Sequence, residues 1–210
     1  GTDLVLDWVR SLHPHWDKID NATATGQQVR WVRTRNDWVY GELSVDSFQE
    51  LMQHVAPRPG EVFVDLGAGT GKVSALASLH FARVVGLELQ SDLHQHSLGL
   101  AGKFQARMEA KGCAVGDIQL CCADFLGHLT EAWKEAGRPW WEVADVAYAC
   151  SPKFCEETMA GLGEKAAAMR PGARFVCVRH DLQAPGLEEL WRGEGHFSWG
   201  RDDLIVYRRC

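Results

Sequence analysis

Three glycines and two carboxylates in this chain could together hold a nucleotide-like ligand. The glycines stand in the turn Gly67-Ala-Gly69-Thr-Gly71, and Asp65 precedes the turn by two residues. Glu88 follows the first glycine by about 20 residues, where a carboxylate can accept both hydroxyl groups of a ribose. Backbone without side chains can approach a ligand closely, and a helix that begins there directs N–H groups toward it.

The spacing favours S-adenosyl-L-methionine (SAM) over a dinucleotide. The dinucleotide fingerprint is G-x-G-x-x-G, whereas this turn is G-x-G-x-G. The carboxylate of Asp65 would repel a pyrophosphate but suits a cationic amine, and SAM carries an amine, a sulfonium and a ribose without phosphate. The strand, the glycine turn and the two acids resemble the first two motifs of class I SAM-dependent methyltransferases. We therefore expect SAM as the cofactor, and include the adjoining Lys72 and Leu89 among its contacts.

Alternating strand-like and helix-like segments must position this turn. Apolar runs predict strands at 61–66, 83–88, 117–122, 145–149 and 173–179, with two more around 195–199 and 203–209. Helical patterns lie between them at 72–81, 91–111, 126–136 and 155–169. This order predicts an α/β, doubly wound, Rossmann-like sheet of seven mostly parallel strands with an antiparallel last strand, which is the class I methyltransferase fold. The fourth strand should lie at its centre.

The first quarter of the chain has a different pattern. Ser44 could cap a helix over 45–56 that carries Phe48, Leu51 and Met52 on one face. We expect residues 1–56 to form an N-terminal cap or lid segment on a methyltransferase domain of residues 57–210. No linker separates the two, so they should make one structural unit.

Composition excludes several classes of protein. The 210 residues carry a net charge of −6, which gives no electrostatic footprint for nucleic acid or an anionic membrane. No apolar run is long enough for a transmembrane helix. Seven cysteines without a C-x-x-C pair predict reduced thiols in a nuclear or cytoplasmic protein. The close histidine pairs do not suit a metal, because His94 and His96 would point to different faces of a helix, so we predict no metal site.

Two loops at the carboxyl ends of predicted strands could complete the site. After the third strand, Asp124 could accept from an adenine amino group while Phe125 covers a ring face. The alternative for this pair is a helix-capping Asp followed by a core Phe. After the fourth strand comes the loop from Cys150 to Phe154, which in class I methyltransferases lies nearest the transferred methyl. The alternative there is an ordinary Ser-Pro turn.

The order of several short motifs resembles the catalytic domain of the disruptor-of-telomeric-silencing family. Members of that family are class I methyltransferases without a SET domain that methylate a lysine of the nucleosome core. The motifs are Tyr40-Gly41-Glu42, the glycine turn, Gly86-Leu87-Glu88, Asp124-Phe125 and Ser198-Trp199. The resemblance identifies the chain as a divergent member of this family.

What the resemblance implies can be written residue by residue. It implies cofactor contacts from Glu42, Asp65, Gly67, Glu88, Asp124 and Phe125. It places Ser151 and Trp199 near the transferred methyl or the acceptor channel. We expect Trp199 and Phe154 to form apolar walls of a lysine channel, and Tyr40 to form part of a lid.

The departures from the family concern the acceptor. The family's Asn-Asn-Phe loop is Cys150-Ser151-Pro152 here, its hydroxyl residue after Tyr-Gly-Glu is Leu43, and its basic extension is not found. The predicted function is SAM-dependent methyl transfer to a protein lysine, with a histone as the candidate substrate. Two alternatives stay open: a non-histone protein or small molecule as acceptor, and a degenerate SAM-binding module that regulates a partner.

Overall fold

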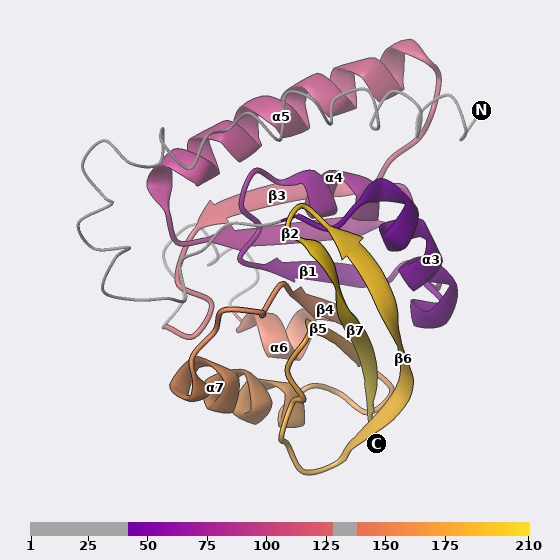
Figure 1. Ribbon diagram of the computed structural model, residues 1–210. Coiled ribbons are helices and arrows are strands. Elements are labelled where there is room, and N and C mark those ends of the chain that lie inside the picture. Colours follow the sequence, from indigo (N-terminus) through magenta and orange to yellow (C-terminus); the bar gives the residue numbers. More distant parts are fainter. Residues whose placement is uncertain (1–41, 128–137) are drawn as a thin grey trace.

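The computed structural model describes residues 42–127 and 138–210, which form a twisted sheet with helices on both faces (Figure 1). In this part of the chain the strands are β1 (Val62–Leu66), β2 (Arg83–Glu88), β3 (Asp117–Cys122), β4 (Val146–Ala149), β5 (Arg174–Val178), β6 (Leu187–Phe197) and β7 (Gly200–Arg209). Their order is β3-β2-β1-β4-β5-β7-β6. Strands β1 to β5 are parallel, and β7 runs antiparallel to β5 and β6. The predicted fold, with the fourth strand at the centre, is confirmed.

The described helices divide the core into two layers. They are α3 (Val45–Val55), α4 (Lys72–Ala77), α5 (Ser91–Ala110), α6 (Trp140–Val143) and α7 (Glu156–Ala167). Successive strand residues face opposite sides of the sheet, so Phe63 packs with α3, α4 and α5, whereas Val64 packs with α6 and α7. Figure 1 shows α5 and α7 on opposite sides of the sheet. None of the described helices is long and apolar enough to cross a membrane.

Helix α3 joins the first described residues to the sheet. The side chain of Ser44 accepts a hydrogen bond from the backbone N–H of Ser47 at 3.2 Å, which confirms the predicted cap. Phe48, Leu51 and Met52 are buried in the same core as α4. The predicted cap segment continues into residues 1–41, which lie outside the described residues, so its domain boundary stays a prediction.

The segment before α3 pairs with the C-terminal hairpin. The backbone N–H of Ser44 donates to the carbonyl of His196 at 2.8 Å, and the N–H of Ser198 donates to the carbonyl of Glu42 at 2.9 Å. Leu43 forms an isolated antiparallel bridge with Phe197. The first described residues therefore meet the turn between β6 and β7, and Glu42 is held beside the glycine turn.

Four elements differ from the sequence prediction. Strand β7 begins at Gly200 instead of residue 203, because the two residues Ser198 and Trp199 are the whole turn that joins it to β6. Helix α4 ends at Ala77 instead of residue 81, because the chain turns there and the carbonyl of Ser78 accepts from the N–H of Gly116 at 2.7 Å. The short helix α6 follows Pro139, and four residues are too few for a helical period to be visible. Strand β6 begins at Leu187, eight residues before the predicted range, because it is an edge strand with mostly exposed polar residues. The predicted helix 126–136 falls mainly on residues 128–137, outside the described residues.

Candidate functional site

The glycine turn is held against the end of β2 by backbone hydrogen bonds. The N–H groups of Gly67 and Ala68 both donate to the carbonyl of Leu87, at 2.8 and 2.9 Å. Gly67 and Gly71 have φ angles of 83° and 82°, a region that glycine adopts without steric cost. Gly71 is the residue before α4, so the turn places the N-terminus of α4 at the carboxyl end of β1.

Glu88 fastens the same turn through its side chain. One carboxylate oxygen accepts from the N–H of Gly69 at 2.7 Å, and the other accepts from the N–H of Gln90 at 2.8 Å. The side chain is buried, and this burial raises its pKa although the backbone N–H groups act in the opposite direction. Leu89 follows with 45% of its surface exposed. Glu88 therefore organises the turn as well as offering a carboxylate beside it.

Asp65 is the second buried carboxylate. Its Oδ2 accepts a hydrogen bond from the hydroxyl of Ser74 at 2.7 Å, and only 2% of the residue is exposed. Burial, with a smaller contribution from the charge of Glu88, raises the pKa of Asp65 to about 7. The carboxyl group therefore changes its charge near neutral pH, and a cation placed beside it would favour the ionised form.

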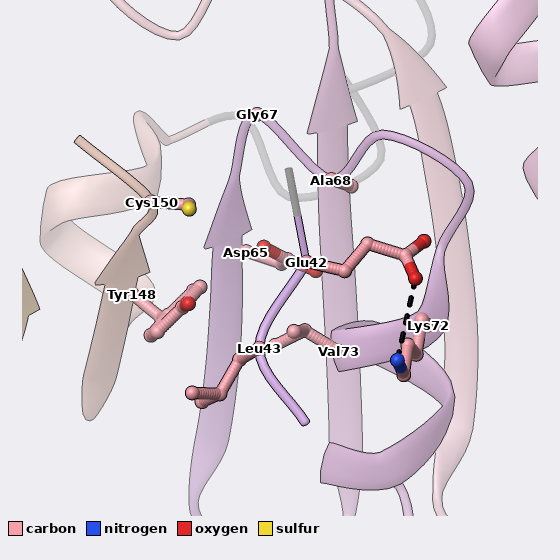
Figure 2. Close-up of a pocket in the computed structure, with 9 residues that line it drawn as sticks. All are labelled: Glu42, Leu43, Asp65, Gly67, Ala68, Lys72, Val73, Tyr148 and Cys150. Atoms are coloured by element: carbon pink, nitrogen blue, oxygen red, sulfur yellow. Dashed lines mark hydrogen bonds and ion pairs between the residues drawn. The ribbon is translucent and has the colours of Figure 1, made fainter. Parts of the chain in front are cut away.

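Glu42 reaches the glycine turn from the segment before α3. Its Oε1 accepts from the hydroxyl of Thr70 at 2.6 Å, and its Oε2 lies 3.3 Å from the Nζ atom of Lys72. Both side chains of this ion pair are almost completely buried. Glu42, which is 30 positions from Lys72 in the sequence, therefore closes one side of the site (Figure 2).

Several of these side chains line an open pocket of about 280 Å³, a volume that includes solvent at its mouth. Its lining residues are Glu42, Leu43, Asp65, Gly67, Ala68, Lys72, Val73, Tyr148 and Cys150 (Figure 2). Four of the predicted cofactor residues, Glu42, Asp65, Gly67 and Lys72, are therefore brought together. Sequence reasoning missed Tyr148 and Val73, because each lies in an apolar segment whose pattern indicates only burial.

Asp124 and Phe125 follow β3, next to Glu88 in space. The N–H of Ala123 donates to the carbonyl of Glu88 at 2.9 Å. The exposed Asp124 accepts from the N–H of Leu126 at 2.8 Å, a local bond of the kind expected for the capping alternative. The ring of Phe125 lies 5.6 Å from that of Phe154, so the loops after β3 and β4 share an aromatic contact.

In the loop after β4, the side chain of Ser151 is directed to β5. Its buried hydroxyl donates to the carbonyl of Val178 at 2.9 Å and accepts from the N–H of the same residue at 3.1 Å. Cys150, in contrast, lines the pocket, and burial raises the pKa of its thiol to about 12. The loop therefore presents a neutral thiol to the pocket, and the Ser151 hydroxyl joins β4 to β5.

Trp199 lies on the C-terminal hairpin, with 38% of its surface exposed. Its ring stacks on Phe197 at 4.5 Å, and its Nε1–H donates to Oδ2 of Asp202 at 3.1 Å. Asp202 also pairs with Arg179, which donates to the carbonyl of Pro152 at 3.3 Å. Trp199 is thus connected through Asp202 and Arg179 to the loop after β4. Neither Trp199 nor Phe154 lines the pocket, and Tyr40 lies outside the described residues.

No group of three potential ligands for a metal ion occurs within residues 42–127 and 138–210.

Comparison with solved structures agrees with this architecture. TrmN from Thermus thermophilus matches 78% of this chain and 48% of its own, with a TM-score of 0.56 and 20% identity. An RNA methyltransferase from Salinibacter ruber, in complex with S-adenosyl-L-homocysteine, matches 78% of this chain and 90% of its own, with a TM-score of 0.56 and 16% identity. At these identities the likeness shows the fold.

Two curated relatives carry the name "Histone-lysine N-methyltransferase, H3 lysine-79 specific". The protein from Eremothecium gossypii is 29% identical over 93 residues, and the protein from Aspergillus fumigatus is 31% identical over 101 residues. These matches cover 44% and 48% of this chain, but only 16% and 20% of the relatives. Residues 24–186 match the family described as "Histone methylation protein DOT1". Because that match spans more than half of the sequence, the chain belongs to the DOT1 family of histone methylation proteins.

Proposed function

We propose that this chain is the catalytic part of a SAM-dependent methyltransferase that acts on a lysine of a protein. One observation carries the proposal: the carboxylates of Glu42, Asp65 and Glu88 all surround the glycine turn. The lysine in the pocket, Lys72, is paired with Glu42. Such a site suits a ligand with a cationic amine and a ribose better than a ligand with phosphates.

The residues present fit SAM. Each oxygen of Glu88 accepts one backbone N–H, and a carboxylate has about four acceptor sites, so it can also accept ribose hydroxyls. Asp65 and Glu42 can hold the ammonium group, and Asp124 with Phe125 can contact the adenine. SAM supplies a methyl group that is already activated on its sulfonium. The residues around the pocket mainly need to hold the cofactor and the acceptor in line.

A protein lysine is the proposed acceptor, and the names of the two curated relatives make a histone the first candidate. A lysine must lose its proton before it can attack, which costs roughly 4–5 kcal/mol at pH 7. Apolar surroundings lower that cost by lowering the pKa of the amine. We propose Trp199 and Phe154 as walls of this channel and Tyr40 as part of its lid, and we assign no general base. A histone substrate would place the protein in the nucleus.

The loop after β4 favours a second candidate, in which the acceptor is a non-histone protein or a small molecule. The hydroxyl of Ser151 is used by Val178, and Cys150 offers only a neutral thiol. This loop therefore offers few free hydrogen-bonding groups to orient a histone lysine. The asparagines that the family has at this position would offer more. The cofactor half of the proposal is the same for both candidates.

Calorimetric binding of SAM and S-adenosylhomocysteine tests the cofactor half. We expect micromolar binding by the wild-type chain and its loss in Glu88→Ala. The control is Glu164→Ala, since Glu164 is exposed on α7 and remote from the pocket residues. Urea unfolding of each variant separates lost binding from lost folding. Absence of binding by the folded wild-type chain would overturn the proposal.

Transfer of radiolabelled methyl groups tests the acceptor half. Nucleosomes, free histones, other proteins and small amines would each be incubated with the protein and labelled SAM, and the modified residue identified by mass spectrometry. Label on a histone lysine supports the first candidate, and label on another acceptor supports the second. Binding of SAM without transfer to any acceptor would instead favour a module that regulates a partner.

A further inference from the structure

The hydroxyl of Tyr148 is buried beside the pocket. Tyr148 lies in β4, only 1% of the residue is exposed, and it lines the pocket on the side opposite Lys72 (Figure 2). Its oxygen has no hydrogen-bond partner among the nitrogen and oxygen atoms of the described residues. The polar group that faces it is the thiol of Cys150, which is a weak partner. Buried hydroxyls in proteins are normally satisfied, so this one requires an explanation.

Packing alone does not explain it. The ring of Tyr148 stacks on Phe63 at 6.4 Å within the apolar core, and a phenylalanine ring would make the same contact. Tyr207, on β7, is different. Its hydroxyl accepts from the N–H of Leu182 at 3.3 Å and lies 3.5 Å from Oδ1 of Asp181. The structure therefore contains one tyrosine whose hydroxyl supports the fold and one whose hydroxyl does not.

The surroundings of Tyr148 indicate which chemical group it could bind. Burial, the neighbouring Cys150 and the carboxylates of Asp65 and Glu42 raise the pKa of Tyr148 far above its ordinary value. The phenol therefore stays neutral, and its oxygen can accept a hydrogen bond. A primary ammonium group has three donors and no acceptor, so it is best held by several oxygen atoms at once. Asp65, Glu42 and Tyr148 provide such a set around one pocket.

We propose that Tyr148 is a ligand-binding residue whose hydroxyl, together with the carboxylate of Asp65, accepts hydrogen bonds from a primary ammonium group. The inference rests on the proposed function, in which this group is the α-ammonium of SAM. It adds to that site a residue from the central strand, on the wall opposite Lys72. It also accounts for the buried hydroxyl, because bound ligand would supply its partner.

Tyr148→Phe tests the role of the hydroxyl. We expect S-adenosylhomocysteine to bind about tenfold more weakly, as for the loss of a hydrogen bond to a charged group. Resistance to urea should be unchanged or higher, because the variant removes a buried hydroxyl whose one partner among the described residues is the weakly bonding thiol of Cys150. The matched control, Tyr207→Phe, should show the reverse: lower resistance to urea and unchanged affinity. Unchanged affinity in Tyr148→Phe, or affinity loss that follows a loss of stability, would overturn the inference.

A series of ligands identifies the group that Tyr148 contacts. Methylthioadenosine lacks the whole amino-acid arm. Two analogues of S-adenosylhomocysteine, one without the amine and one without the carboxylate, show which group of that arm matters. The loss of affinity in Tyr148→Phe should persist with the analogue that lacks the carboxylate. It should disappear with methylthioadenosine and with the analogue that lacks the amine. An effect that follows the carboxylate would contradict the inference. If wild-type protein bound none of these ligands, the proposed function itself would fail. If the wild type and Tyr148→Phe bound them equally, only the role of Tyr148 would fail.

Discussion

The glycine turn and the C-terminal hairpin form two sides of the candidate site, and they are held in different ways. The turn is fixed by backbone N–H groups, which donate to the carbonyl of Leu87 and to the buried carboxylate of Glu88. The hairpin side depends on contacts among Trp199, Asp202 and Arg179, and the side chains of Trp199 and Arg179 are more than a third exposed. Losing a buried hydrogen bond to the backbone costs more stability than losing a pair of exposed side chains. This difference predicts that substitutions near the turn, which we propose as the cofactor side, lower stability more than substitutions on the hairpin, which we propose as part of the acceptor side.

The largest expected effect concerns the charge of Asp65. Its pKa is raised from 3.8 to about 7, so the folded protein holds this proton more tightly than the unfolded chain does. Stability should therefore fall as the pH rises from about 4 to about 7, by up to about 4 kcal/mol from this group. Affinity for a cationic ligand should change in the opposite direction, because the ammonium group requires the ionised carboxylate.

Asp65→Asn should remove both trends while keeping an acceptor for Ser74. Urea unfolding and calorimetry from pH 5 to pH 8 on both proteins would measure them. If the difference in stability between wild type and variant did not depend on pH, the raised pKa would be wrong.

A smaller effect is expected where β2 packs under the glycine turn. A Cβ atom on Gly86 would lie 2.6 Å from Leu120 Cδ2, 2.8 Å from Ser74 Oγ and 2.9 Å from Ala68 Cβ. Gly86→Ala should therefore cost about 1–3 kcal/mol of stability and weaken the binding of S-adenosylhomocysteine. The control is Gly99→Ala on exposed α5, where no atom lies within 4 Å, and it should stabilise by about 0.5–1 kcal/mol. Equal effects in the two variants would contradict this account of the cofactor side.

A substitution at Ser151 tests whether its hydroxyl has a structural or a catalytic role in the loop after β4. Ser151→Ala would leave the buried N–H of Val178 without its side-chain partner, at a cost of about 1–3 kcal/mol, whereas the carbonyl of Val178 still accepts from the N–H of His180. Cofactor affinity should not change. The measurements are thermal unfolding, calorimetry and the rate of methyl transfer per folded molecule. Wild-type stability with a reduced transfer rate would assign the hydroxyl to the acceptor instead.

The smallest effects on stability are expected at the hairpin. Arg179 has a φ angle of 68°, and its partly exposed guanidinium pairs with the carboxylate of Asp202, which also accepts from Trp199 Nε1–H and the N–H of Asp203. Arg179→Ala should lower stability by less than about 1 kcal/mol. Arg179→Gly should be up to about 1 kcal/mol more stable than the Ala variant, because glycine tolerates the left-handed conformation.

Both Arg179 variants should bind S-adenosylhomocysteine like the wild type, while the KM for the acceptor rises. A large loss of cofactor affinity in either one would remove the distinction between the two sides of the site.

Local sequence patterns predicted most of the sheet and the turn. The bounds of β3 agree with the predicted 117–122, although β3 is an edge strand in which only Cys121 is buried. The bounds of β2 agree with the apolar run at 83–88, because a parallel strand that is buried on both faces is mostly apolar. The positions of Asp65 and Glu88 follow from their place at the ends of adjacent strands. Strand β6 was predicted too short, because it is an edge strand with exposed polar residues and has no continuous apolar run.

The sequence by itself determined the order of strands and helices, the glycine turn and the two acids beside it, because these depend on neighbours in the chain. Only the tertiary structure decided which distant side chains share the pocket. Glu42 reaches Lys72 because the segment before α3 pairs with the C-terminal hairpin, and Ser151 is directed to Val178 instead of the pocket. The hydroxyl of Tyr148 is exceptional only in that context, because whether a buried polar group is satisfied depends on every element packed around it.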